Sequence, residues 1–84
     1  MNIKEEVKKL IIKCSEQQDL KVENTTDLLK EEILDSLALA KLISEIEAFF
    51  PIEELDPDDI SPENFTSVDT IAHLISRRLS DGRG

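Results

Sequence analysis

Apolar residues recur at helical spacing in three stretches of the chain, with charged residues on the opposite faces. The first stretch carries its apolar residues at Ile3, Val7, Leu10, Ile11 and Cys14. Asn2 and Glu5 have the spacing of a capping box, so the pattern predicts a helix over about residues 2–17. On its apolar face, Cys14 is expected to be a small core residue.

The second stretch is the most apolar, and its apolar residues are Leu37, Leu39, Ala40, Leu42, Ile43, Ile46, Ala48, Phe49 and Phe50. Asp35 and Ser36 supply N-cap chemistry at its start, and Pro51 stops it. The third stretch carries Val68, Ile71, Ala72, Leu74, Ile75 and Leu79. Thr66 or Ser67 is expected to cap this last helix.

The connections between these stretches differ in length. Residues 19–35 have no sustained period, which predicts a long loop that admits a short helical turn within 26–31. A few aliphatic side chains should pin this loop to the core: Val22, Leu28, Leu29, Ile33 and Leu34. Asp56 followed by Pro57 predicts the start of a short third helix, which Ser61 and Pro62 would close.

Three long amphipathic helices and one short helix predict an all-α fold, a small four-helix bundle with a long first loop. No segment shows a competing strand alternation. A single domain is expected over residues 1–80, followed by a frayed tail at 81–84. The N-terminus carries acids at once and no uninterrupted apolar stretch, so neither a signal peptide nor a membrane span is expected.

Charge narrows the range of partners. The 84 residues hold 10 basic and 19 acidic side chains, a net charge of −9, which argues against nucleic acid as a partner. Residues 31–63 contain eleven acids and one base, so the acidic excess lies in this segment. It predicts either a solvated face or a docking surface for basic partners.

The single cysteine, the acids of residues 53–59 and the single histidine give little indication of a disulfide, a metal site or a catalytic site. A lone cysteine cannot form an internal disulfide and indicates a reducing, cytoplasmic setting. The acids of residues 53–59 lack the central glycine of a calcium loop, so at most a weak divalent-cation site is expected there. His73 is the only histidine and is expected at the surface or half-buried on the last helix. The chain lacks a strand–turn–helix nucleophile elbow and is too small to enclose a substrate, so an autonomous enzyme is not expected.

Ser36 stands out because a long loop delivers it to the start of the most apolar helix. A hydroxyl there lies close to backbone N–H groups that have no helical partner, a location that favours an attached phosphate. The alternative is that Ser36 is simply the N-cap, with Asp35 assisting.

The segments from the long loop onward have a recognisable order and spacing: Leu34-Asp35-Ser36-Leu37, Leu42-Ile43, Glu45-Ile46-Glu47, Phe49-Phe50-Pro51-Ile52, Asp58-Asp59-Ile60, Asn64-Phe65-Thr66-Ser67-Val68 and Ile71. Together they resemble the acyl carrier protein family, the phosphopantetheine-attachment domains. The resemblance extends from about Ile3 to Leu79 in helix order and loop lengths.

The resemblance implies a carrier rather than an enzyme. Ser36 matches the serine to which a phosphopantetheinyl transferase attaches 4'-phosphopantetheine from coenzyme A, and the thiol of this arm holds acyl or aminoacyl groups as thioesters. Asp35 matches the acid before that serine, and Leu37 the apolar residue that packs behind it and contacts partners. A loading ligase and downstream acyl-using enzymes would bind a monomeric carrier at residues that include Leu37, Lys41, Glu45, Glu47 and Ile60.

Two departures bear on the branch of the family. Ala38 and Lys41 stand where typical fatty-acid carriers have acids, and residues 31–34 lack the usual glycine. Both departures argue against the housekeeping fatty-acid role. The Leu34-Asp35-Ser36-Leu37 form and the Phe50-Pro51-Ile52 segment resemble stand-alone carriers for amino acids or specialised biosynthesis, including the D-alanyl carrier group. The competing interpretation is an unmodified acidic helical interaction module, either an adaptor or an inactive carrier-like scaffold.

Overall fold

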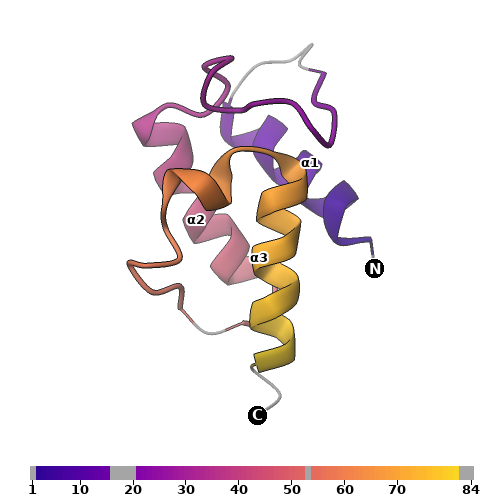
Figure 1. Cartoon of the computed structure of the whole chain (residues 1–84), viewed down its shortest axis with the longest axis vertical. Coiled ribbons are helices and arrows are strands. Elements are labelled where there is room, and N and C mark those ends of the chain that lie inside the picture. The colour runs from indigo at the N-terminus through magenta and orange to yellow at the C-terminus, as the bar shows by residue number, and fades with distance from the viewer. Residues whose placement is uncertain (1, 16–20, 53, 82–84) are drawn as a thin grey trace.

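The computed structural model describes residues 2–15, 21–52 and 54–81, and within these ranges the regular secondary structure is all helical, without strands. The helices are α1 (Ile3–Ser15), α2 (Ser36–Phe49), the 3-10 helix η1 (Pro62–Phe65) and α3 (Val68–Asp81) (Figure 1). The prediction of an all-α fold with three long helices is therefore confirmed. The fourth element is only a 3-10 turn. Residues 16–17, the predicted end of the first helix, and residues 82–84 of the predicted tail lie outside the described ranges, whereas Asp81, predicted to belong to the tail, is the last residue of α3.

Side chains just before each long helix satisfy its first backbone N–H groups. Asn2 Oδ1 accepts the Glu5 N–H at 3.2 Å, as the capping-box spacing predicts. Asp35 Oδ1 accepts the Ala38 N–H at 2.8 Å. At α3, the Thr70 N–H donates to Ser67 Oγ at 3.2 Å and the Ser67 N–H donates to Thr70 Oγ1 at 3.0 Å, which identifies Ser67 as the cap.

The short third helix predicted at Asp56–Ser61 is wrong in its position. Residues 57–59 form a turn, closed by the Asp59 N–H donating to the Asp56 carbonyl at 2.9 Å. Ser61 and Pro62 were predicted to end the short helix, but Pro62 is instead the first residue of η1. A proline is tolerated at this position because its missing N–H would have no helical acceptor there. Phe65, the last residue of η1, is fully buried and fixes the segment to the core.

The long loop is anchored as predicted, and backbone hydrogen bonds reinforce it. The Leu28 N–H donates to the Thr66 carbonyl at 2.7 Å, and the Asp69 N–H donates to the Asn24 carbonyl at 3.0 Å. The Glu31 N–H donates to the Asp27 carbonyl at 3.0 Å, forming the expected single helical turn. These hydrogen bonds therefore fix the path of the loop that leads to Ser36.

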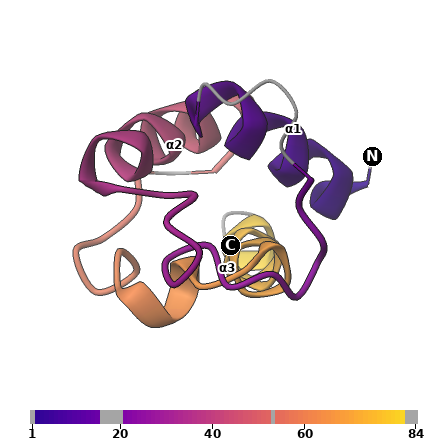
Figure 2. The ribbon, with the colours of Figure 1, turned by 90° about the horizontal axis from the view of Figure 1, so that it is seen from above.

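A single apolar core joins the elements. α1 packs against both α2 and α3, and α3 packs against η1. In Figure 2, α3 is seen almost end-on, with α1 and α2 together on one side of it. The buried apolar side chains are Val7, Leu10, Ile11, Cys14, Leu28, Ile33, Leu34, Ala38, Leu42, Ile46, Phe50, Leu55, Phe65, Val68, Ile71, Ala72, Leu74 and Ile75. Among the described residues, no helix has both the length and the apolar character that crossing a membrane requires.

Candidate functional site

At the start of α2, Asp35 caps the helix and the next residue, Ser36, is left exposed. Asp35 is the N-cap, since its backbone is extended (φ −90°, ψ −177°) and its carboxylate accepts the Ala38 N–H. Ser36 is the first helical residue and is exposed. Its hydroxyl makes no hydrogen bond to any residue that the structure describes. The alternative in which Ser36 itself caps the helix is therefore wrong.

Backbone donors lie beside the Ser36 hydroxyl. The Ala38 N–H is used by the Asp35 carboxylate, and the Leu39 N–H donates to the Asp35 carbonyl at 2.8 Å. The N–H groups of Ser36 and Leu37, at the first two helical positions, have no acceptor within the described residues. Together with the helix dipole, these two donors favour a phosphate group attached at Ser36.

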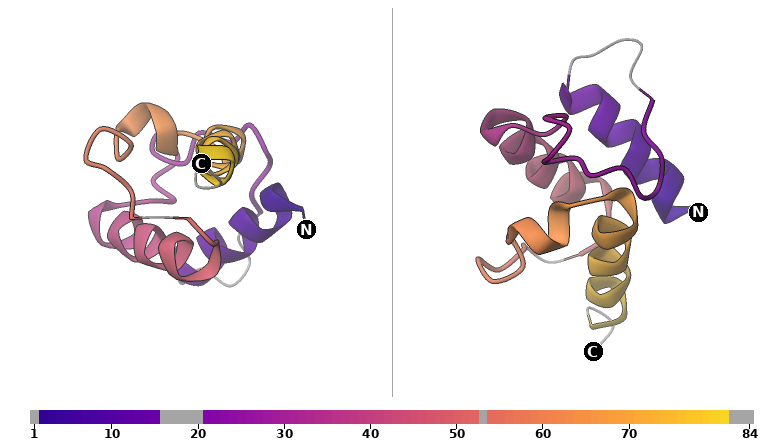
Figure 3. Two further views of the ribbon diagram at one scale, coloured as in Figure 1. Left: turned by 90° about the horizontal axis from the view of Figure 1, so that it is seen from below. Right: turned by 45° about the horizontal axis from the view of Figure 1, so that its top comes forward.

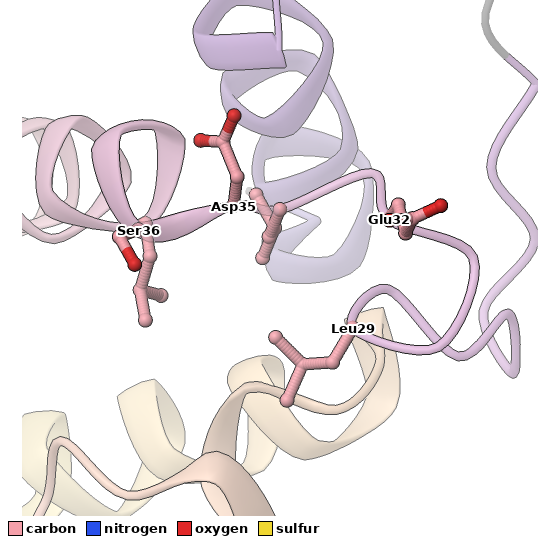
Figure 4. Close-up of a pocket in the computed structure, with 6 residues that line it drawn as sticks. Leu29, Glu32, Asp35 and Ser36 are labelled. Carbon is pink, nitrogen blue, oxygen red and sulfur yellow. The ribbon is translucent and has the colours of Figure 1, made fainter.

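An open hollow of about 370 Å³ adjoins Ser36. Its lining residues come from the long loop and from the first turn of α2: Leu29, Glu32, Leu34, Asp35, Ser36 and Leu39. Figure 4 shows the Leu29 side chain reaching toward the Ser36 side of the hollow, whereas the Asp35 carboxylate points to the opposite side of the chain. The hollow therefore offers an apolar wall directly beside a free hydroxyl.

A smaller cavity of about 80 Å³ lies among Cys14, Ser15, Glu32, Ile33, Asp35, Leu37, Ala38 and Lys41. Cys14 is buried, as predicted. Burial, reinforced by the nearby negative charge of Glu45, raises the pKa of the Cys14 thiol, while Lys13 and Lys41 act in the opposite direction. The protonated thiol is thus favoured, and it makes Cys14 a core residue rather than a nucleophile.

The residues predicted to contact partners do not share one environment. Leu37 is 66% exposed, so it does not pack behind Ser36 as the resemblance implied, and its side chain is accessible to a partner. Lys41 is also exposed, on the same helix. Ile60, 38% exposed, lies in the connection between α2 and η1.

Glu45 and Glu47 have contacts inside the fold. Glu45 Oε2 lies 3.1 Å from Lys13 Nζ, which links α2 to α1. Glu47 Oε2 accepts the Leu55 N–H at 2.8 Å. Both carboxylates therefore support the structure, and substitution there would change stability as well as any association with a partner.

The acids that suggested a weak metal site are partly engaged by a cation of the chain itself. Arg78 Nη2 lies 3.2 Å from Asp59 Oδ2 and 3.5 Å from Asp56 Oδ2. In the part of the chain that the structure describes, which excludes Glu53, no three metal-ligating side chains converge. His73 is exposed on α3, at the surface as predicted.

Sequence reasoning missed the wall of the hollow and one backbone feature beside it. Leu29, Leu34 and Leu39 were recognised as core or loop anchors, and nothing in their spacing indicated that they border a cavity. Glu32 has a positive φ of 57°, a conformation that glycine adopts more readily. The sequence offered one indication of this conformation, because carriers usually have a glycine within the segment that corresponds to residues 31–34. That indication points to the segment and does not single out Glu32.

No protein-family model matches the sequence, and no curated protein shows a significant match to it.

Proposed function

We propose that the protein is an acyl carrier that bears 4'-phosphopantetheine on Ser36 and delivers acyl or aminoacyl groups to partner enzymes. The observation that carries the proposal is the exposed and unbonded Ser36 hydroxyl at the first position of α2, left free because Asp35 caps the helix. An acyl-carrier-like four-helix arrangement, with η1 as the short member, and a cytoplasmic location belong to the same proposal.

The residues around Ser36 fit such a group. The free N–H groups of Ser36 and Leu37 would hold the phosphate, which as a diester carries one negative charge. The apolar wall formed by Leu29, Leu34 and Leu39 would lie against the arm. The arm supplies a terminal thiol that carries the cargo as a thioester, and the protein contributes position and access rather than catalysis.

Exposure at the start of α2 supports a partner surface around the attachment point. Leu37 presents an apolar side chain beside Ser36, and Lys41 gives this end of the helix a positive charge in place of the acids of fatty-acid carriers. A phosphopantetheinyl transferase, a loading ligase and acyl-using enzymes would approach here. Carriage of amino acids or of specialised acyl groups is the more consistent assignment.

Intact-mass measurement tests the proposal. The full chain is incubated with coenzyme A and a phosphopantetheinyl transferase of broad specificity, and the mass should rise by one phosphopantetheine group. Ser36→Ala should abolish the increase. Ser44→Ala, which removes another exposed serine of α2, should leave it unchanged. An unaltered mass with several such transferases, or labelling that survives Ser36→Ala, would refute the assignment.

A second candidate is an unmodified interaction module, favoured by three large apolar side chains that remain exposed. Leu37, Phe49 and Ile60 are 66%, 48% and 38% exposed. In that case the mass would stay constant, and Leu37→Ala would weaken association with a partner while Ser36→Ala would not. The two candidates therefore differ in whether removing the Ser36 hydroxyl changes the behaviour of the protein.

A further inference from the structure

The guanidinium group of Arg78 contacts three residues of the connection between α2 and η1. Arg78 Nη2, in the last turn of α3, lies 3.2 Å from Asp59 Oδ2 and 3.5 Å from Asp56 Oδ2. It also donates to the Glu54 carbonyl at 3.4 Å. The side chains of Arg78 and Asp59 are only 22% and 19% exposed, so this contact is better shielded from solvent than the other ion pairs of the described residues.

The remaining anchors of residues 54–60 are few. Leu55 is the one buried side chain of this segment, and its N–H donates to the Glu47 carboxylate at 2.8 Å. Asn64 Nδ2 donates to the Asp59 carbonyl at 2.9 Å. Backbone hydrogen bonds within the segment are local, such as those of the Asp59 and Ile60 N–H groups to the Asp56 carbonyl.

The long first loop is held differently. Backbone hydrogen bonds join it to Thr66 and Asp69, and these do not depend on any side-chain charge. Residues 54–60, seen as a wide loop leading into η1 in Figure 3, have no backbone hydrogen bond to another element within the described ranges. Their attachment to the body of the molecule therefore depends on side chains, and Arg78 makes three of those contacts.

Charge within the segment favours its release once Arg78 is removed. Four carboxylates, those of Glu54, Asp56, Asp58 and Asp59, lie within six residues. Among the described residues, Arg78 is the only cation that forms an ion pair with any of them, so it offsets their mutual repulsion. A segment with one buried side chain and a charge-dependent attachment can open at a lower free energy than the whole domain.

We propose that residues 54–60 form a strap that Arg78 latches to α3 and that opens as a local unit. Opening withdraws Leu55 from the core and uncovers the core beside the C-terminal end of α2. This device is independent of the proposed modification, because none of its residues borders the hollow beside Ser36.

Native-state amide hydrogen exchange on the full chain tests the strap. In the wild-type protein, the Leu55 amide should exchange faster than the Leu42 amide, which reports α2 in the core. Arg78→Gln should accelerate exchange at Leu55 by roughly five- to thirtyfold and change Leu42 much less. Asp59→Asn, which keeps the shape of the side chain and removes its charge, should act in the same direction.

Arg77→Gln is the matched control, because it removes the same charge from the preceding residue of α3, which is exposed and forms no ion pair with the strap within the described ranges. It should leave exchange at Leu55 within about twofold of wild type. Combining Arg78→Gln with Asp59→Asn should give no more acceleration than Arg78→Gln alone, since the ion pair that Asp59→Asn removes is one of the three contacts that Arg78→Gln already removes. Equal protection of Leu55 and Leu42 in the wild type, or an equal effect of Arg77→Gln, would overturn the proposal.

Discussion

Asp35 and Ser36 are both good N-cap residues, and the structure assigns them different tasks. The distinction depends on where the backbone leaves the helical region, and Asp35 is the residue with extended geometry. A sequence pattern cannot fix this point to within one residue, because either side chain can reach an N–H two or three positions ahead. The capping bond from Ala38 to Asp35 therefore shows that the Ser36 side chain is not the cap of this helix.

Glu32 ends the turn of the long loop in a strained conformation. The Ile33 N–H donates to the Leu28 carbonyl at 2.9 Å and the Glu32 N–H donates to the Leu29 carbonyl at 3.2 Å, which is the Schellman pattern. The pattern places Glu32 at a positive φ of 57°. Glycine has no Cβ and adopts this φ freely, so we expect Glu32→Gly to raise the free energy of unfolding by about 0.5–1 kcal/mol.

Urea denaturation of Glu32→Ala alongside Glu32→Gly separates strain from loss of the carboxylate. Alanine removes the charge but keeps the Cβ, so this variant should stay within about 0.5 kcal/mol of wild type. A glycine variant no more stable than the alanine variant would show that the positive φ stores no significant strain.

At the scale of elements, Glu47 joins α2 to the connection that follows it. Its carboxylate accepts the N–H of the buried residue Leu55 at 2.8 Å, and Glu47→Ala would leave that donor without a partner. We expect Glu47→Ala to lower the free energy of unfolding by about 1–3 kcal/mol, measured by urea denaturation. Glu47→Gln retains an oxygen acceptor and should cost less.

Glu45→Ala provides the comparison on the same helix. It removes an ion pair with Lys13 whose side chains are 66% and 36% exposed, and such pairs contribute about 0.2–1 kcal/mol. A loss at Glu47→Ala no larger than that at Glu45→Ala would contradict a structural role for the hydrogen bond. Tests of partner binding at Glu47 should therefore be normalised to the folded fraction.

The periodic helices were predictable, whereas the short element was not. α1, α2 and α3 each bury a stripe of apolar side chains, and that stripe is visible as a period in the sequence. Asp56-Pro57 and Ser61-Pro62 carry the same local start signal, so local chemistry alone could not select between them. Burial of Phe65, a tertiary effect, favours the second.

The hollow was beyond prediction for a related reason. Leu29 comes from the loop and Leu39 from α2, and both are only partly buried against the core. Hydrophobic pattern shows that such residues avoid water, but it does not show whether a neighbour covers them. Only the path of the long loop, fixed by its bonds to Thr66 and Asp69, leaves a gap beside Ser36.

For the whole molecule, the net negative charge opposes the compact fold. The radius of gyration is 11.9 Å, close to the value of about 12 Å expected for a folded chain of this length. The net charge is −9, with eleven of the nineteen acids in residues 31–63. Folding therefore concentrates like charges. The ion pairs among the described residues are mostly exposed, so each offsets little of the repulsion.

Salt should consequently stabilise the fold. Raising sodium chloride from about 10 mM to 150 mM shortens the Debye length from about 30 to 8 Å, which screens repulsion between distant acids more than contacts at 3–4 Å. We expect the free energy of unfolding to increase by about 1 kcal/mol, or roughly 4–8 °C in Tm. Glu31→Lys, at an exposed position without an ion pair among the described residues, reduces the net charge and should show a smaller gain, with Glu31→Gln between the two. A Tm that falls as salt is added would mean that the ion pairs of Lys4, Lys13 and Arg78 outweigh the repulsion.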